Sequence, residues 1–201
     1  MNDILRREQI ANITLALSYL YFFGNNFAFL TYQFRWSVLF LAVFNLFLAV
    51  NAIFRRSPRC VSLAPFDIFI TLMGTYSVTF MVGVGTQQEI LALQIIGGCG
   101  LLLSLSGVLA LNKSFGLLPA DRGVIKTGIY RFIRHPIYAG YFISNCCFIV
   151  QNYSHWNLGC FTLFVVFEML RLLREEKLLC QNPEYFQYTQ ETRWRIIPAL
   201  W

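Results

Sequence analysis

Residues 90–111 read ILALQIIGGCGLLLSLSGVLAL, a run without one charged side chain. An α-helix needs about 20 apolar residues to cross a hydrocarbon core of ~30 Å, so this run is typical of a transmembrane helix. Its glycines at 97, 98, 100 and 107 lie inside an apolar helix and do not follow a strand, which argues against a dinucleotide-binding loop. Small residues at this spacing instead predict close packing against a neighbouring helix.

Further apolar runs lie outward from this one, and the whole composition agrees with a membrane protein. The chain is 57% hydrophobic and 13% charged, whereas soluble domains carry about 25% charged residues. The runs are 10–31, 37–54, 63–85, 137–152 and 156–173. The fifth span, 137–152, is short and is expected to lean on the sixth. We therefore predict an all-α integral membrane protein with about six transmembrane helices.

The intervening loops are too short to form a second domain. Residues 1–201 are therefore predicted to be a single membrane domain, with N-terminal transmembrane helices in 1–111 and a separate functional region in 112–201. Asp67 follows Pro65 at the start of the third run, where an acidic side chain favours a helix N-terminus.

Basic residues predict the orientation of the spans. If the N-terminus is cytoplasmic, every Lys and Arg except Arg35 falls on the cytoplasmic side. The positive-inside rule therefore predicts a multi-pass protein with both termini cytoplasmic, in the inner membrane if the source is bacterial. The formal charge of +6 reflects this topology, and no basic module typical of nucleic-acid binding is visible.

Cysteine and histidine usage gives no sign of a metal site. The six cysteines show no C-x-x-C spacing and are expected to be small apolar packing residues. The two histidines, His135 and His155, are expected on opposite sides of the membrane, so no metal and no histidine-based metal site is predicted.

Polar chemistry begins at Asn112. A loop of about 25 residues runs from Asn112 to Pro136 and contains the first part of GIYRFIRHPIYAG at 128–140, and loops of that length are usually functional. Glu175-Glu176 and a polar, aromatic tail from Arg174 to Trp201 follow one hydrophobic hairpin later. Charged groups at a membrane boundary are retained only when they are paired, snorkelling or functional.

These side chains suit a ligand with an aromatic ring, a ribose, a carboxylate and a cation. Carboxylates bind amino groups or ribose hydroxyls, aromatic faces bind a sulfonium, and arginine binds a carboxylate. S-adenosylmethionine has all these groups, and a nicotinamide dinucleotide fits the residue types as well. Structural roles stay open for several positions. Glu175 and Glu176 could form surface ion pairs, Glu168 could neutralise Arg171, and Tyr185 and Tyr188 could be interfacial anchors.

The order of motifs resembles a known family. A series of motifs in the second half of the chain resembles the isoprenylcysteine carboxyl methyltransferase family. In order, the motifs are Ser114-Phe115-Gly116, Arg122-Gly123-Val124, Thr127-Gly128-Ile129-Tyr130, Arg134-His135-Pro136-Ile137-Tyr138, Arg171, Glu175-Glu176, Tyr185, Tyr188, Arg193 and Pro198. The wider group includes the phospholipid N-methyltransferases. The resemblance covers about residues 112–201, and R-H-P-x-Y followed by a hairpin and E-E is its specific part.

The resemblance implies a membrane-embedded methyltransferase that uses S-adenosylmethionine, with S-adenosylhomocysteine as product. The cofactor-binding residues that it implies are Arg122, Gly123, Val124, Ile125, Tyr130, His135, Pro136, Ile137, Tyr138 and Glu175. Arg171 and Arg134 would lie on the substrate side, and Arg171 and Glu176 would be catalytic. The segment between Glu176 and Tyr185 is shorter than in eukaryotic members, so their substrate pocket is not carried over.

Methyl transfer from a sulfonium is an in-line displacement in which positioning dominates. A carboxylate acceptor needs no base, whereas an amine or thiol would use Glu176 or His135. The expected partner is a lipophilic small molecule or lipid that resembles an isoprenylcysteine carboxylate. Two alternatives are an NADPH-dependent membrane reductase, because the C-terminal part of sterol reductases is similar, and a membrane scaffold or carrier.

Overall fold

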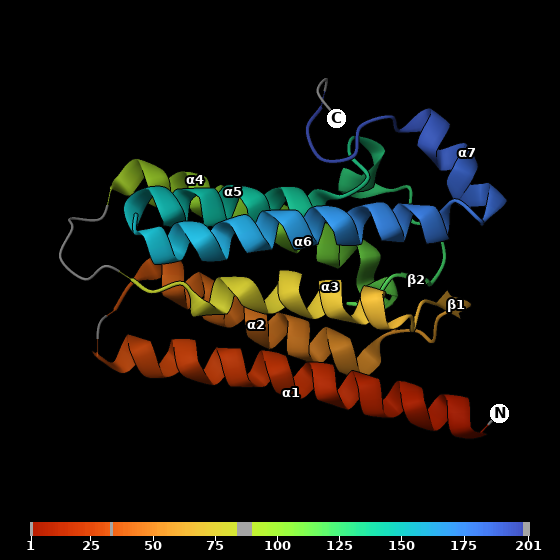
Figure 1. Cartoon of the computed structure of the whole chain (residues 1–201), viewed down its shortest axis with the longest axis horizontal. Coiled ribbons are helices and arrows are strands. Elements are labelled where there is room, and N and C mark those ends of the chain that lie inside the picture. Colours follow the sequence, from red (N-terminus) through yellow and green to blue (C-terminus); the bar gives the residue numbers. More distant parts are fainter. Residues whose placement is uncertain (1, 33, 84–89, 199–201) are drawn as a thin grey trace.

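A computed structural model of the chain describes residues 2–32, 34–83 and 90–198 (Figure 1). The chain is 74% helical with almost no sheet, which confirms the predicted all-α class. The main helices are α1 (Asn2–Tyr32), α2 (Trp36–Phe54), α3 (Pro65–Ser77), α4 (Leu91–Leu111), α5 (Pro136–Gln151), α6 (His155–Leu179) and α7 (Pro183–Glu191). The short elements are η1 (Val78–Phe80), η2 (Asn112–Ser114), η3 (Gly128–Arg131), β1 (Cys60–Val61) and β2 (Ala120–Asp121).

Helices α1 to α6 occupy the six predicted apolar runs. Residues 84 and 85 of the third run lie outside the described residues. Helix α6 continues to Leu179, so Arg174 and the glutamate pair stand on this helix and not in the tail. Among the described residues, Asn12–Tyr32, Leu91–Ser114 and His155–Leu179 are long and apolar enough to cross a membrane, and Val38–Phe54 is apolar but shorter. The count of six spans therefore stays a prediction.

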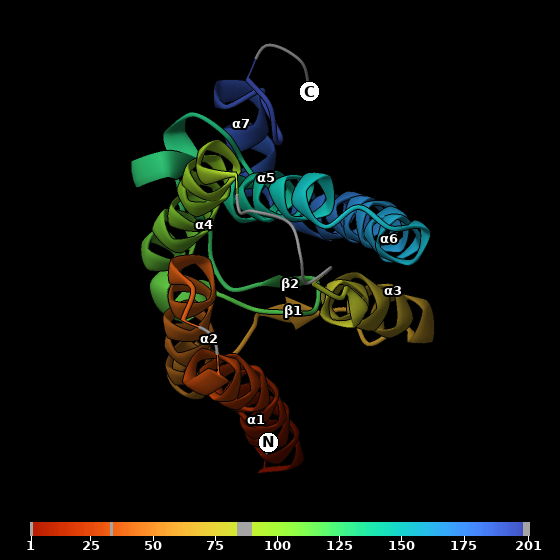
Figure 2. The ribbon, with the colours of Figure 1, turned by 90° about the vertical axis from the view of Figure 1, so that its left-hand side faces the viewer.

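The helices pack mainly in three pairs, α1 with α2, α3 with α6 and α4 with α5 (Figure 2). The fifth span contacts the sixth, as expected, but α5 packs chiefly along α4. Small residues cause this pairing: a Cβ on Gly140 would lie 2.2 Å from the carbonyl oxygen of Gly100. The Ser104 hydroxyl of α4 also donates to the Ile137 carbonyl of α5, at 3.0 Å. The small-residue run in α4 thus acts as predicted.

An ion pair joins α3 to α6. Asp67 lies in the first turn of α3, as predicted, and its buried carboxylate accepts hydrogen bonds from Ser62 and from Nε of Arg174, the latter at 2.7 Å. The two helices also approach closely at Gly74, where a Cβ would lie 2.7 Å from Oε1 of Glu168. The N-terminal helix α3 is therefore held against the C-terminal region.

The two short strands connect the first half of the chain to the loop that follows α4. Strands β1 and β2 pair in antiparallel register, with Cys60 opposite Asp121 and Val61 opposite Ala120. This pairing places the loop across one end of the bundle. The start of α1, the two strands and α7 lie at this end (Figure 1).

Candidate functional site

The turn before α5 is fixed by the C-terminal tail. The backbone N–H of Arg134 donates to the carbonyl of Trp194 at 2.9 Å, and that of His135 donates to the carbonyl of Arg195 at 2.8 Å. Pro136 occupies the first turn of α5, where its missing N–H costs nothing. The turn and the tail therefore form one unit, although they are distant in sequence.

Glu176 holds this unit from α6. Its carboxylate lies 2.8 Å from Nε of Arg134, 3.2 Å from Nε2 of His135 and 2.5 Å from Nε of Arg195. The side chains of Glu176, Arg134 and His135 are all buried, so the charges of Glu176 and Arg134 depend on each other for compensation. The Glu176 carboxylate is engaged with three partners, and Glu176 does not line the cavity described below.

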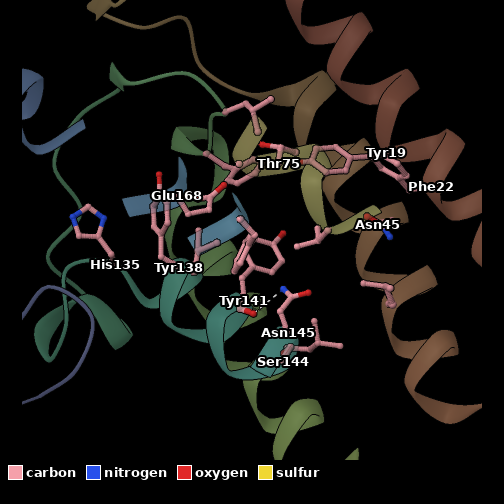
Figure 3. A pocket seen from close by; sticks show the side chains of 18 of the residues that line it. Tyr19, Phe22, Asn45, Thr75, His135, Tyr138, Tyr141, Ser144, Asn145 and Glu168 are labelled. Atoms are coloured by element: carbon pink, nitrogen blue, oxygen red, sulfur yellow. Dashed lines mark hydrogen bonds between the residues drawn. The ribbon is translucent and has the colours of Figure 1, made fainter. Parts of the chain in front are cut away.

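Glu175, the neighbour of Glu176 on α6, takes part in a second cluster. Its Oε2 accepts a hydrogen bond of 2.7 Å from the Tyr138 hydroxyl. The guanidinium of Arg171 lies over the ring of Tyr138, with Cζ 5.3 Å from the ring centroid. Nη1 of Arg171 also donates to both oxygens of Glu168, at 3.1 and 3.3 Å. The possibility that Glu168 neutralises Arg171 is thus confirmed, and Figure 3 shows Tyr138 and Glu168 side by side.

The loop after β2 adopts a conformation that needs glycine. Gly123 has φ +97°, in the left-handed region that other residues avoid, and its N–H donates to Oδ1 of Asp121 at 2.9 Å. Nε of the buried Arg122 donates to the carbonyl of Arg56 at 3.0 Å, and the Ser114 hydroxyl donates to the carbonyl of Arg122. These bonds fix the loop against the N-terminal half.

Two tail tyrosines of α7 are buried and do not anchor to a membrane interface. The Tyr188 hydroxyl donates to the carbonyl of Tyr130 at 2.6 Å, and burial raises the pKa of Tyr188 to about 12, so the hydroxyl is protonated at neutral pH. Burial also raises the pKa of Tyr185 and of Tyr130. The Tyr185 hydroxyl is buried without a hydrogen-bond partner in the described part of the chain, and Tyr185 lines the cavity.

These groups meet at one end of a cavity of about 1540 Å³ that continues between the helices. Its volume exceeds the ~300–1000 Å³ of most small-molecule sites. The structure brings most of the predicted site residues to its wall, whereas Pro136 and Glu176 do not line it. The predicted residues that line it are Arg122, Gly123, Val124, Ile125, Tyr130, Arg134, His135, Ile137, Tyr138, Arg171 and Glu175.

Further residues on four helices line the cavity but were not predicted from the sequence. Tyr19 of α1, Asn45 of α2, Thr75 of α3 and Tyr141 of α5 also line the cavity (Figure 3). No local signal distinguishes them, because a single polar or aromatic residue in an apolar helix is compatible with ordinary packing. Asn45, for example, reads as a residue for hydrogen bonding between helices.

A comparison with known proteins concerns the segment that supplies the end of the cavity described above, which we call the polar end. Residues 112–181 match the model of the isoprenylcysteine carboxyl methyltransferase (ICMT) family, which confirms the resemblance predicted from the sequence. No curated protein matches the chain. The matched segment begins with the loop after α4 and includes the turn before α5 and both glutamates of α6. The family match and the apolar helices together support a membrane methyltransferase.

Proposed function

We propose that the chain transfers a methyl group from S-adenosylmethionine to a lipophilic acceptor. The observation that carries this proposal is the position of the family-matched residues at one end of a cavity that continues among apolar helices. A polar cofactor and an apolar acceptor need such adjoining compartments. The orientation implied by the basic residues would open the polar end to the cytoplasm, with both termini on that side.

The groups at the polar end fit the cofactor. Glu175 has one carboxylate oxygen bonded to Tyr138, which leaves the other to bind an amino group or ribose hydroxyls. The unpartnered Tyr185 hydroxyl offers a further hydrogen bond, and Tyr130 offers an aromatic face for a ring or a sulfonium. When bound, S-adenosylmethionine supplies an electrophilic methyl group on a sulfonium.

Arg171 and Glu168 lie where an acceptor would meet this end. The side chains of Arg171 and Glu168 are only 11% and 12% exposed, and both line the cavity. A fixed, planar guanidinium orients a carboxylate or a similar acidic head group. A carboxylate oxygen already carries the electron pair that it donates, so this reaction requires alignment and exclusion of water and no base.

We assign Glu176 and Arg134 to positioning. Both belong to the buried ionic cluster that holds the turn before α5 against the tail. Their contribution would be to keep His135 and Tyr138 in place at the cavity wall. A base role for Glu176 would require its carboxylate to leave three partners, which is costly for a buried charge.

Ligand binding by the purified protein in nanodiscs tests the proposal. Isothermal titration should detect S-adenosylhomocysteine and no binding of NADPH. Glu175→Ala should weaken S-adenosylhomocysteine binding about ten- to a hundredfold, because the ligand then loses a charged partner. Glu184→Ala removes an exposed carboxylate from α7 and is the matched control. Binding of NADPH without S-adenosylhomocysteine would contradict the proposal and favour a reductase.

A further inference from the structure

The cavity continues past the polar end into a second group of polar side chains. Tyr19 and Asn45 come from helices outside the family-matched segment, and each is less than one tenth exposed, at 6% and 8%. Both line the cavity, together with Thr75, Tyr141 and Asn145. Figure 3 shows His135 and Tyr138 at one end of this wall, Asn45 at the other, and Tyr141 between them.

Most of these polar groups have no hydrogen-bond partner in the part of the chain that the structure describes. The Thr75 hydroxyl oxygen is buried without one. Among the described residues, the Tyr19 and Tyr141 hydroxyls and the Asn45 amide form no hydrogen bond with another side chain or backbone group. The Asn145 amide nitrogen donates to the carbonyl of Tyr141 at 2.8 Å, which leaves its oxygen as an acceptor. A set of donors and acceptors thus faces the space between α1, α2, α3 and α5.

Helix geometry gives the depth of this group. Tyr141 and Asn145 follow Tyr138 by about one and two turns of α5. At 1.5 Å per residue, Asn145 lies about 10 Å farther along the helix than Tyr138. A ligand whose head group meets Arg171 would therefore reach the second polar group about 10 Å along its own length.

An unbroken hydrocarbon chain fits this part of the cavity poorly. It would separate the hydroxyls and amides from water without offering a hydrogen bond, and buried polar groups without partners are destabilising. A site built to bind a hydroxyl or carbonyl strongly rejects an analogue that lacks it, because the site's own groups are then left unpaired.

We propose that the acceptor is a lipophile with a second hydrogen-bonding group, a hydroxyl or a carbonyl, about 10 Å from its methylated head. This inference rests on the proposed function and specifies its substrate class. Asn145, with Tyr19, Asn45 and Tyr141 on the same wall, would select the acceptor by binding that group. Helices α1 and α2 would then contribute to specificity together with α5, while the motif residues of the family-matched segment supply the transfer site.

Two matched probes test the inference. One is a linear thioether carboxylate with an unbroken C15 hydrocarbon tail, and the other carries a hydroxyl about 10 Å from the carboxylate. Their dissociation constants are measured by titration against the full chain in nanodiscs, without cofactor. The hydroxylated probe should bind about tenfold or more tightly than the hydrocarbon probe. Equal affinities, or tighter binding of the hydrocarbon probe, would overturn the inference.

Variants locate the preference within the cavity. Asn45→Leu and Tyr141→Phe should each lower the ratio of the two affinities severalfold, mainly by weakening the hydroxylated probe. Asn51→Leu is the control on the same helix, because the Asn51 amide donates to the carbonyl of Phe47 and does not line the cavity. An equal loss in Asn51→Leu would count against the inference.

A separate titration with S-adenosylhomocysteine distinguishes this inference from the proposed function. If the hydroxylated probe is preferred but S-adenosylhomocysteine does not bind, the methyltransferase proposal fails and the ligand class of the cavity stands. If S-adenosylhomocysteine binds but the probes bind equally, the proposed function stands and the acceptor inference fails.

Discussion

The C-terminal region, residues 112–198, and the first two helices, α1 and α2, bury polar groups in different ways. The C-terminal region buries charges that are paired with one another, such as Arg134 with Glu176. Helices α1 and α2 place neutral groups, such as the Tyr19 hydroxyl and the Asn45 amide, on a cavity wall, where they have no hydrogen-bond partner among the described residues. Paired charges fix the shape of a site, whereas unpartnered neutral groups leave it ready for a ligand. The paired charges of the C-terminal region therefore account for the assembly of the site, and the neutral groups on the cavity wall account for its choice of ligand.

The largest effect is expected from breaking the ionic cluster of the C-terminal region. Glu176→Ala leaves the buried guanidinium of Arg134 without its carboxylate, so the variant should lose about 3–5 kcal/mol of stability toward unfolding. Denaturant unfolding in detergent measures this loss. Glu184→Ala, at an exposed position on α7, should change stability little. Equal stability of the two variants would contradict the structural role of the cluster.

A smaller loss should follow from separating α4 and α5. In Gly140→Val, the new Cβ would lie 2.2 Å from the carbonyl oxygen of Gly100. Overpacking of this kind typically lowers the free energy of unfolding by about 1–3 kcal/mol. The same unfolding measurement applies. Gly159→Val is the matched control, because a Cβ on this α6 glycine meets nothing within 4 Å. If both substitutions were tolerated alike, close packing at Gly140 would not be required.

Arg171→Lys tests whether Arg171, a cavity residue of the C-terminal region, acts on the acceptor or on the cofactor. Lysine keeps the charge beside Glu168 but loses the planar fork, so turnover should fall about tenfold, equivalent to the ~1.5 kcal/mol of one charge-assisted hydrogen bond. The affinity for S-adenosylhomocysteine should be retained. Methyl transfer and ligand titration measure the two effects separately, with the exposed Arg193→Lys as control. A parallel loss of binding would assign Arg171 to the cofactor.

The smallest effect is expected within the N-terminal helices. The Tyr76 hydroxyl donates to the Ser18 hydroxyl at 3.0 Å, and Tyr76→Phe should lower stability by about 0.5–1.5 kcal/mol. Tyr21→Phe, at an exposed position on α1, serves as the control in the same unfolding assay. If Tyr76→Phe lowered stability as much as Glu176→Ala does, the two regions would not differ in how they depend on their buried polar groups.

Much of the fold and part of the site could be predicted from the sequence. Apolar length locates α1 to α6, and the small residues of α4 predict a close neighbour, because both signals are local. The pairing of α3 with α6 could not be predicted, since Asp67 and Arg174 are 107 positions apart and either residue alone reads as a boundary charge. The same applies to Tyr19, which reaches the cavity only through the packing of distant helices. The roles predicted for individual site residues stay predictions.

The bridge between Asp67 and Arg174 also has a consequence for biogenesis. Helix α3 emerges from the ribosome long before α6, so its aspartate has no arginine to meet while the first helices leave the translocon. A carboxylate that is buried without its partner is destabilising, so α3 should not reach its final position until α6 has been made. The contact between α3 and α6 would then form late and out of sequence order.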